Sequence, residues 1–202
     1  MSQMEDVIII DYATGNLRSV CNALDRLGAR WRLSSDAGEI SAAERVLLPG
    51  VGDASCAMNE LKARGLDDVV RGLTVPVLGI CVGMQLLCRS SEEGNVNCLG
   101  IFNAPVCRLQ PDAEAGVKVP HMGWNTLTCL TSPLFEGLED GCFAYFVHSY
   151  AASLCPETIA LAQNGIPFSA ALSRENFYGV QFHPEKSGEV GSRILCNFLN
   201  IK

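Results

Sequence analysis

Residues 75–85 place a cysteine between two segments of opposite character, in the sequence Val75-Pro76-Val77-Leu78-Gly79-Ile80-Cys81-Val82-Gly83-Met84-Gln85. The apolar run Val75–Ile80 is typical of a buried strand, and Val82–Arg89 is expected to form the helix that follows it. At their junction stands Gly-x-Cys-x-Gly, the pattern of a nucleophile elbow with cysteine in the usual place of serine. These residues predict a sharp strand-to-helix turn centred on Cys81.

Such a turn strains the backbone of the nucleophile, and its flanking glycines keep side chains out of a crowded place. The turn raises the thiol at the C-terminal edge of the sheet, where ligands bind in open α/β folds. The start of the helix behind Cys81 favours the thiolate form. Cys81 is therefore the candidate nucleophile.

The first half of the chain alternates expected strands with expected helices. The apolar residues Leu17, Val20, Leu24 and Leu27 recur at helical spacing. A turn at Tyr12–Gly15 and a cap at Asn16 would precede this helix, and Gly28 would end it. The other expected elements of this half are strands at Val7–Asp11, Trp31–Leu33 and Val46–Leu48, and a helix from Asp53 to about Arg64. This alternation predicts a mostly parallel central sheet with helices on both faces.

The second half predicts additional strands, several of them antiparallel, because short apolar runs alternate with Pro, Gly and Asn between Ile101 and Gly179. The expected strands are Cys142–Val147, Thr158–Ala162, Phe168–Leu172 and Tyr178–Phe182. A helix over Ser187–Asn200 closes the chain. With no repeat and no long linker, residues 1–202 are expected to form a single α/β domain.

Composition narrows the class of protein. The chain has 202 residues, 48% of them hydrophobic, and a net charge of −7, which disfavours binding to nucleic acid or to an anionic membrane. Its acidic start is followed by only four apolar residues, Val7 to Ile10, so no secretory signal is expected and the predicted location is the cytoplasm.

The ten cysteines show neither Cys-x-x-Cys nor Cys-x-x-His spacing, which argues against a structural zinc site. In a cytoplasmic chain most of them are expected to be reduced core residues. Only Cys81 has surroundings that predict reactivity.

A cysteine nucleophile needs a base, because an unperturbed thiol is only a few per cent ionised at neutral pH. His183 is followed by Pro184, which favours an extended backbone at His183. Residues two apart in an extended chain project to the same side, so Glu185 is expected beside His183. Cys81, His183 and Glu185 thus supply a nucleophile, a base and a carboxylate that orients the base.

An oxyanion site would complete this chemistry. The backbone N–H of Val82, directly after the nucleophile, is one expected donor. The loop Gly50-Val51-Gly52 is the second candidate, since its glycines permit close approach and reorientation of a peptide group.

The two other histidines, His121 and His148, have no carboxylate two or three residues away. Structural or interface roles are therefore expected for both, rather than that of a base.

These motifs resemble those of the class I, or triad-type, glutamine amidotransferases. The class is marked by residues 49–52, 79–85 and 183–185, with Val82 in a position where the family usually has leucine. Within the class, the chain is most similar to glutaminase subunits of imidazole glycerol phosphate synthase. That similarity rests on residues 11–12 with 15–17, on Pro120–Asn125, on Tyr145–Tyr150 and on Phe177–Ser187; Ala13 stands where glycine is common.

The resemblance implies hydrolysis of glutamine to glutamate and ammonia through a thioester on Cys81, without a metal or organic cofactor. It implies glutamine-binding roles for Gly52 and Gln85, with the backbone of Ser149 and Tyr150. The ammonia would pass to a cyclase subunit, a (β/α)8 barrel in a heterodimer with this chain. The cyclase makes imidazole glycerol phosphate and aminoimidazole carboxamide ribotide in histidine biosynthesis, a lyase reaction. The positions that match the family's docking face are Met122, Trp124, Asn125, Tyr145 and Lys186.

Three other functions remain open at this point. The nearest is a glutaminase subunit of another ammonia-using synthase, such as one for pyridoxal phosphate, guanylate or anthranilate. A cysteine peptidase or hydrolase could share the elbow, but it would need an open cleft and no partner. A catalytically silent binding subunit is disfavoured, because no member of the expected triad is replaced.

Overall fold

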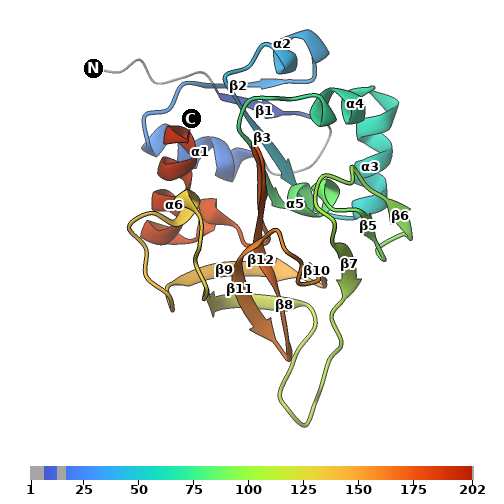
Figure 1. Cartoon of the computed structure of the whole chain (residues 1–202), viewed down its shortest axis with the longest axis vertical. Helices are drawn as coiled ribbons and strands as arrows, with labels where there is room; N and C mark the ends of the chain where they lie inside the picture. Colours follow the sequence, from blue (N-terminus) through green and yellow to red (C-terminus); the bar gives the residue numbers. More distant parts are fainter. Residues whose placement is uncertain (1–6, 13–16, 202) are drawn as a thin grey trace.

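The computed structural model describes residues 7–12 and 17–201, so the expected turn at Tyr12–Gly15 lies partly, and the cap at Asn16 wholly, outside the described residues. A seven-stranded sheet with the order β11-β12-β13-β4-β3-β1-β2 forms the centre (Figure 1). Strands β2, β1, β3, β4 and β13 are parallel, whereas β13, β12 and β11 are antiparallel. The strands are β1 Val7–Ile10, β2 Trp31–Ser34, β3 Arg45–Gly50, β4 Val77–Cys81, β11 Thr158–Asn164, β12 Ile166–Arg174 and β13 Phe177–Val180. The predicted fold class is confirmed.

Helices cover both faces of this sheet. In Figure 1, α1 and α6 lie on one side of the sheet and α3, α4 and α5 on the other. The helices are α1 Arg18–Arg26, α2 Ala37–Ser41, α3 Ala54–Ala63, α4 Leu66–Arg71, α5 Val82–Leu87 and α6 Gly188–Asn200, with 3-10 turns η1 at Pro133–Phe135 and η2 at Pro184–Lys186. The strands β1, β3, β4 and β13 are buried along their whole length, as expected for a sheet covered on both faces.

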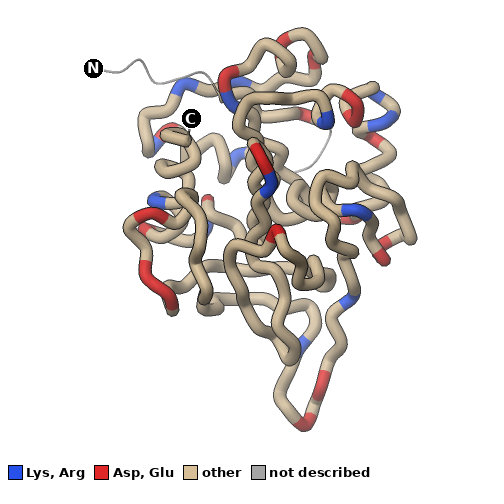
Figure 2. Tube along the Cα trace, viewed as in Figure 1, with Lys and Arg blue, Asp and Glu red and all other residues tan. Residues whose placement is uncertain are grey.

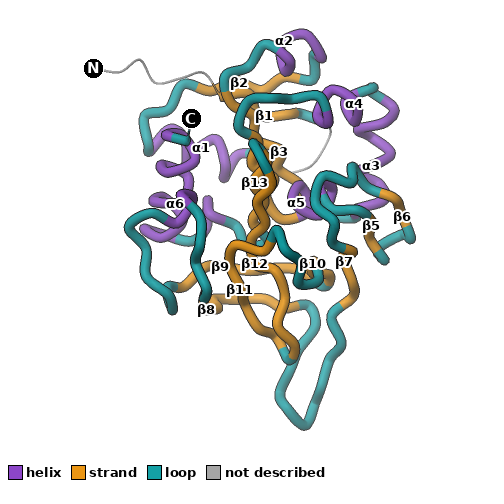
Figure 3. The backbone as a smooth tube through the Cα atoms, in the orientation of Figure 1, coloured by secondary structure: helices purple, strands orange, loops and turns teal. Residues whose placement is uncertain are grey.

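Two smaller sheets stand at the C-terminal edge of the parallel strands (Figure 3). One has the order β10-β7-β5-β6, and the other is a two-stranded antiparallel ribbon of β8 and β9. Their strands are β5 Ser90–Ser91, β6 Val96–Asn97, β7 Pro105–Arg108, β8 His121–Thr126, β9 Phe143–His148 and β10 Tyr150–Ala152. Of these, only β9 was expected from the sequence.

The expected elements need corrections at their ends. The helix expected over Val82–Arg89 stops at Leu87, because Cys88 takes an extended backbone. The strand expected over Tyr178–Phe182 runs instead from Phe177 to Val180. Helices α2 and α4 were not expected, being five and six residues long.

All ten cysteines are free. The expectation that they are core residues holds for Cys21, Cys88 and Cys98, which are buried, but is wrong for Cys56 and Cys129, which are exposed. Within residues 7–12 and 17–201, no helix is long and apolar enough to cross a membrane.

Three glycines bring the first turn of α5 against the end of β3. A Cβ atom on Gly83 would lie 1.8 Å from the carbonyl oxygen of Leu48. A Cβ on Gly50 would lie 2.6 Å from the amide nitrogen of Gly83, and one on Gly79 would lie 2.8 Å from the Gly83 backbone. All three distances are far inside van der Waals contact, so these positions require glycine for lack of space.

We predict that Gly83→Ala destabilises the fold by about 3 kcal/mol or more, because the new methyl group meets backbone that cannot move aside cheaply. The measurement is the free energy of unfolding in urea. Gly72→Ala is the matched control, because its Cβ would meet its nearest atom at 3.4 Å. An unfolding curve for Gly83→Ala that matches that of the control would contradict the steric argument.

Candidate functional site

Cys81 is the last residue of β4 and directly precedes α5. Its backbone has φ 54° and ψ −111°, outside the regions that a residue with a side chain normally occupies. Such a conformation costs on the order of 1–3 kcal/mol and persists only where the surroundings impose it. Here the close approach of α5 to β3 imposes it, as the elbow motif predicts.

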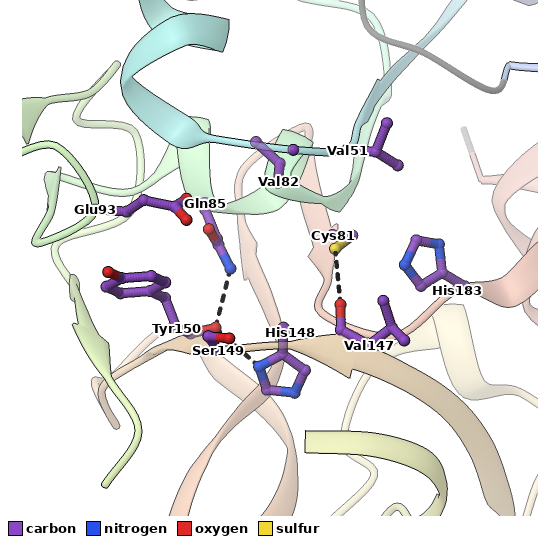
Figure 4. A pocket seen from close by; sticks show the side chains of 11 residues that line it. Val51, Cys81, Val82, Gln85, Glu93, Val147, His148, Ser149, Tyr150 and His183 are labelled. Carbon is purple, nitrogen blue, oxygen red and sulfur yellow. Dashed lines mark hydrogen bonds between the residues drawn. The ribbon is translucent and has the colours of Figure 1, made fainter. Parts of the chain in front are cut away.

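The side chain of Cys81 faces a cavity of about 90 Å³ (Figure 4). The lining comes from five places in the fold: the end of β3, the elbow with the start of α5, the turn between β5 and β6, the end of β9 with the residues after it, and the residues after β13. The lining residues are Val51, Gly52, Cys81, Val82, Gln85, Glu93, Val147, His148, Ser149, Tyr150 and His183. Residues expected to act as nucleophile, base and binding groups thus share one small cavity.

His183 reaches this cavity because β13 runs parallel to β4, with Val180 opposite Ile80. Both chains leave the sheet at the same edge, which brings His183 and Cys81 to one place (Figure 4). The His183 amide donates to the Tyr145 carbonyl at 2.8 Å and anchors the segment to β9.

Glu185 lies against His183, with 2.8 Å between Nδ1 and Oε1. The two side chains are only 4% and 5% exposed. The expected proximity is present, but its backbone cause differs from the prediction: His183 is extended, and Pro184–Lys186 then form a 3-10 turn that carries Glu185 back. The imidazole nitrogen Nδ1 donates to the carboxylate, so the other ring nitrogen, Nε2, lies on the cavity side of the ring.

The surroundings of His183 favour its protonated form. Burial opposes the charge, but the Cys81 sulfur and the Glu185 carboxylate outweigh burial and raise the pKa of His183 to about 10. Nε2 is buried and has no hydrogen-bond partner among residues 7–12 and 17–201. An imidazole held in this way can exchange a proton with the sulfur or with a group bound in the cavity.

The Cys81 sulfur has two weak polar contacts. Its thiol donates to the Val147 carbonyl at 3.9 Å, and the Gln181 amide donates to the sulfur at 3.7 Å. Both contacts hold the sulfur in place at the end of the cavity.

The residues expected at an oxyanion site lie beside the sulfur. Gly50 ends β3 opposite Cys81, and Val51 and Gly52 continue into the cavity wall. Gly52 has φ +92°, a conformation open to glycine, and Val51 is 38% exposed. Val82 is the first residue of α5, and the first N–H groups of a helix have no partner within it.

The opposite wall is built on the Tyr150 carbonyl. Gln85 Nε2 donates to it at 3.0 Å and also to Gln181 Oε1 at 3.0 Å. Ser149 lines the cavity between His148 and Tyr150. The glutamine-binding positions implied by the resemblance therefore lie in the same cavity as Cys81.

His148 lines the cavity but is held in a different way from His183. Its Nδ1 lies 2.8 Å from the Tyr150 carbonyl and its Nε2 lies 2.9 Å from Nδ1 of His121. Burial lowers the pKa of His148 to about 3 and also lowers that of His121. Both nitrogens of His148 are occupied, in accord with the structural role expected for it.

The five positions expected at a partner interface divide between two faces of the β8–β9 ribbon and one turn. Met122 and Trp124 point outward and are 66% and 56% exposed. Tyr145 lies opposite Trp124, with their ring centroids 6.0 Å apart. Asn125 points inward and bonds to His121 and to the Gln163 carbonyl, whereas Lys186 is exposed in η2.

Sequence reasoning missed Gln181, Glu93 and Val147. Gln181 stood out in one respect, as an amide in an otherwise apolar run two residues before His183. Glu93 lines the cavity and caps α3 through the Ala54 amide, and burial raises its pKa. Its loop position carried no local signal, because the contact joins residues 39 apart.

In the described part of the chain, no group of three or more His, Cys, Asp or Glu side chains is arranged to hold a metal ion.

We predict that stability falls as pH rises above about 6.5. The pKa of His183 is 6.5 in an ordinary setting and about 10 in the fold, so the folded chain binds this proton more tightly than the unfolded chain. The stabilisation is complete below about pH 6.5 and is lost as pH rises toward 10. Urea unfolding between pH 6 and pH 9 measures the slope.

Glu185→Gln is expected to flatten that slope and to lower stability at pH 6.5 by about 2 kcal/mol, because a buried charged hydrogen bond is lost. Glu189→Gln, at an exposed position of α6, is the control and keeps the wild-type slope. A wild-type slope in Glu185→Gln would contradict the assignment of the raised pKa to this pair.

Comparison with known proteins identifies relatives along the full chain. The family model for glutamine amidotransferase class-I matches residues 8–201. Imidazole glycerol phosphate synthase subunit HisH of Bacteroides fragilis is 53% identical over 195 residues, covering 96% of this chain and 99% of that protein. The subunit of the same name from Escherichia coli K12 is 46% identical over 198 residues, covering 97% of this chain and 100% of that protein.

Solved structures share the fold at lower sequence identity. A glutamine amidotransferase crystal structure superposes with a TM-score of 0.73 at 19% identity, covering 96% of this chain and 97% of that one. A glutamine amidotransferase from Thermotoga maritima superposes with a TM-score of 0.65 at 16% identity, covering 98% and 84%.

Proposed function

Because this chain belongs to the class I glutamine amidotransferase family, we propose that it is the glutaminase subunit of an imidazole glycerol phosphate synthase. It would act in the cytoplasm as one domain spanning residues 1–202. The observation that carries the proposal is the convergence of Cys81, the His183–Glu185 pair and Gln85 on one small cavity, in a chain whose relatives are named as that subunit.

In this proposal the Cys81 sulfur attacks the side-chain amide carbon of glutamine. His183 gives its proton to the departing nitrogen, so ammonia leaves and a glutamyl thioester remains on Cys81. Water then attacks the thioester with His183 as base, which releases glutamate and restores the thiol. Glu185 holds the imidazole with Nε2 toward the reacting atoms and stabilises its protonated form.

The oxyanion formed in both steps would lie beside the elbow. The Val82 N–H and the backbone of Gly50, Val51 and Gly52 are the proposed donors, since they border Cys81. Gln85 and Gly52, with the backbone of Ser149 and Tyr150, would hold the substrate.

The proposed partner is a cyclase subunit that consumes the ammonia. The outer face of the β8–β9 ribbon supports this, because Met122, Trp124 and Phe143 are exposed there and both strands lack charged residues (Figure 2). An exposed apolar patch of this kind marks a protein interaction site. Val147 stands opposite Met122 on that face and also lines the cavity, so a docked partner would lie beside the place where ammonia is released.

The alternative is a glutaminase that serves another ammonia-using synthase. It would use the same cavity and differ only in the partner that stimulates it. The two are separated by measuring glutamate release with each candidate synthase.

We predict that Cys81→Ala abolishes glutamine-dependent cyclisation in the complex with the cyclase, because no other group in the cavity can form the thioester. Ammonia added from outside should still support cyclisation in the partner. Cys56→Ala, at an exposed cysteine, is the matched control and keeps wild-type activity. Glutamine-dependent turnover in Cys81→Ala would show that the nucleophile is another group.

We predict low glutaminase activity for the chain alone and a large rise with the cyclase and its nucleotide. Trp124→Ala should weaken the complex by about tenfold or more, since buried aromatic anchors dominate interface energies. Leu33→Ala is the control, because this residue is 43% exposed on β2 at the other end of the central sheet. Titration calorimetry measures both affinities. Equal affinities for the two variants would place the interface elsewhere, and full activity without a partner would contradict a partner-dependent glutaminase.

A further inference from the structure

His121 and His148 have no part in the proposed mechanism. A continuous chain of hydrogen bonds nevertheless connects both of them to Cys81. Its centre is the Tyr150 carbonyl, which accepts from His148 Nδ1 at 2.8 Å and from Gln85 Nε2 at 3.0 Å. A carbonyl oxygen can only accept. The hydrogen positions on both neighbours are therefore determined by the Tyr150 carbonyl.

Away from the nucleophile, the carbonyl fixes two tautomers. His148 must carry its hydrogen on Nδ1, so in the neutral ring Nε2 is an acceptor. His121 Nδ1, 2.9 Å away, must then be the donor, and His121 Nε2 becomes an acceptor for the Asn125 amide at 3.1 Å. Both histidines are consequently Nδ1–H tautomers.

Toward the nucleophile, the same carbonyl fixes two side-chain amides. Gln85 must present nitrogen to Tyr150, and its second N–H goes to Gln181 Oε1 at 3.0 Å. Gln181 must then present its nitrogen to the Cys81 sulfur. Gln85 Oε1 is left buried, with no partner among residues 7–12 and 17–201.

The surroundings keep the histidine pair neutral and in place. His121 and His148 are opposite each other in the β8–β9 ribbon and are only 8% and 7% exposed. The His121 ring stacks on Phe146 at 4.9 Å between centroids, and His148 meets the edge of Phe168 at 5.2 Å. Such apolar walls disfavour a charged ring and hold both rings in one orientation.

We propose that His148, supported by His121, is a positioning residue for glutamine binding: its hydrogen bond holds the Tyr150 carbonyl in place, and that carbonyl fixes the Gln85 amide in the cavity wall. The inference rests on the proposed function, since it specifies how the glutaminase pocket recognises glutamine. Without the His148 donor the Tyr150 carbonyl loses one hydrogen bond and holds the Gln85 amide less firmly.

The tautomers are tested by two-bond ¹H–¹⁵N correlation spectra of the full chain at pH 7. The sequence has three histidines, so three ring systems are observed. His121 and His148 are each expected to show a protonated Nδ1 and a bare Nε2. An Nε2–H tautomer on either ring would overturn the chain of bonds, and this result does not depend on any enzymatic activity.

The positioning role is tested by kinetics of the complex with the cyclase. His148→Phe keeps a ring of similar size but removes the donor to Tyr150. The KM for glutamine should rise about tenfold, the equivalent of one hydrogen bond of about 1.4 kcal/mol. The kcat at saturating glutamine and the ammonia-dependent activity should change less than about threefold.

His148→Asn provides the rescue, because its amide nitrogen occupies the place of Nδ1. Its KM should lie within about threefold of wild type. If His148→Asn is impaired as much as His148→Phe, or if His148→Phe lowers kcat with KM unchanged, the positioning role is overturned. If His148→Phe does not fold, the KM of His148→Asn and the tautomer spectra still test the positioning role. A wild-type complex that releases no glutamate would instead refute the proposed function.

Discussion

The close approach of α5 to the end of β3 is the contact on which the site depends. Gly50, Gly79 and Gly83 remove the side chains that would separate the two backbones. The turn between them then has no room except at a positive φ, which Cys81 adopts. Strain at one residue is thus balanced by packing of the central sheet, and the thiol is held at the edge where β13 delivers His183. A looser elbow would relax Cys81 and move the sulfur out of the cavity.

Two histidines in the same cavity illustrate how surroundings determine chemistry. His183 faces a carboxylate and a sulfur, which raise its pKa to about 10. His148 faces a carbonyl and a neutral imidazole behind aromatic rings, and burial lowers its pKa to about 3. Near neutral pH the His183 ring is protonated and can give up a proton, whereas the neutral His148 ring keeps its single N–H in the bond to Tyr150. Pairs of titratable groups driven apart in this way are typical of sites that combine proton transfer with rigid binding.

The elbow and the His183–Glu185 pair could be predicted from sequence because each depends on residues within a few positions of one another. The parallel sheet followed from the alternation of strands and helices. The resemblance named Gln85 and Tyr150 as glutamine-binding positions, but the hydrogen bonds around Tyr150 could not be predicted. Gln85, His148 and Gln181 meet only through the registers of β4 with β13 and of β8 with β9. Strands of two residues, such as β5 and β6, give too short a pattern to detect. The backbone around Glu185 was misjudged, since the turn after Pro184 is a tertiary consequence of packing against β9.

The distribution of thiols has a practical consequence for chemical labelling. Cys56 and Cys129 stand in water, whereas Cys81 is 4% exposed at the end of a small cavity. A general alkylating reagent therefore meets the two surface thiols first, and the extent of its reaction reports on them rather than on the elbow. Selective modification of Cys81 requires a reagent that fits the cavity, such as a glutamine-like molecule with an electrophilic carbon in place of the side-chain amide. The cysteines of this chain therefore differ in solvent exposure as well as in chemical reactivity.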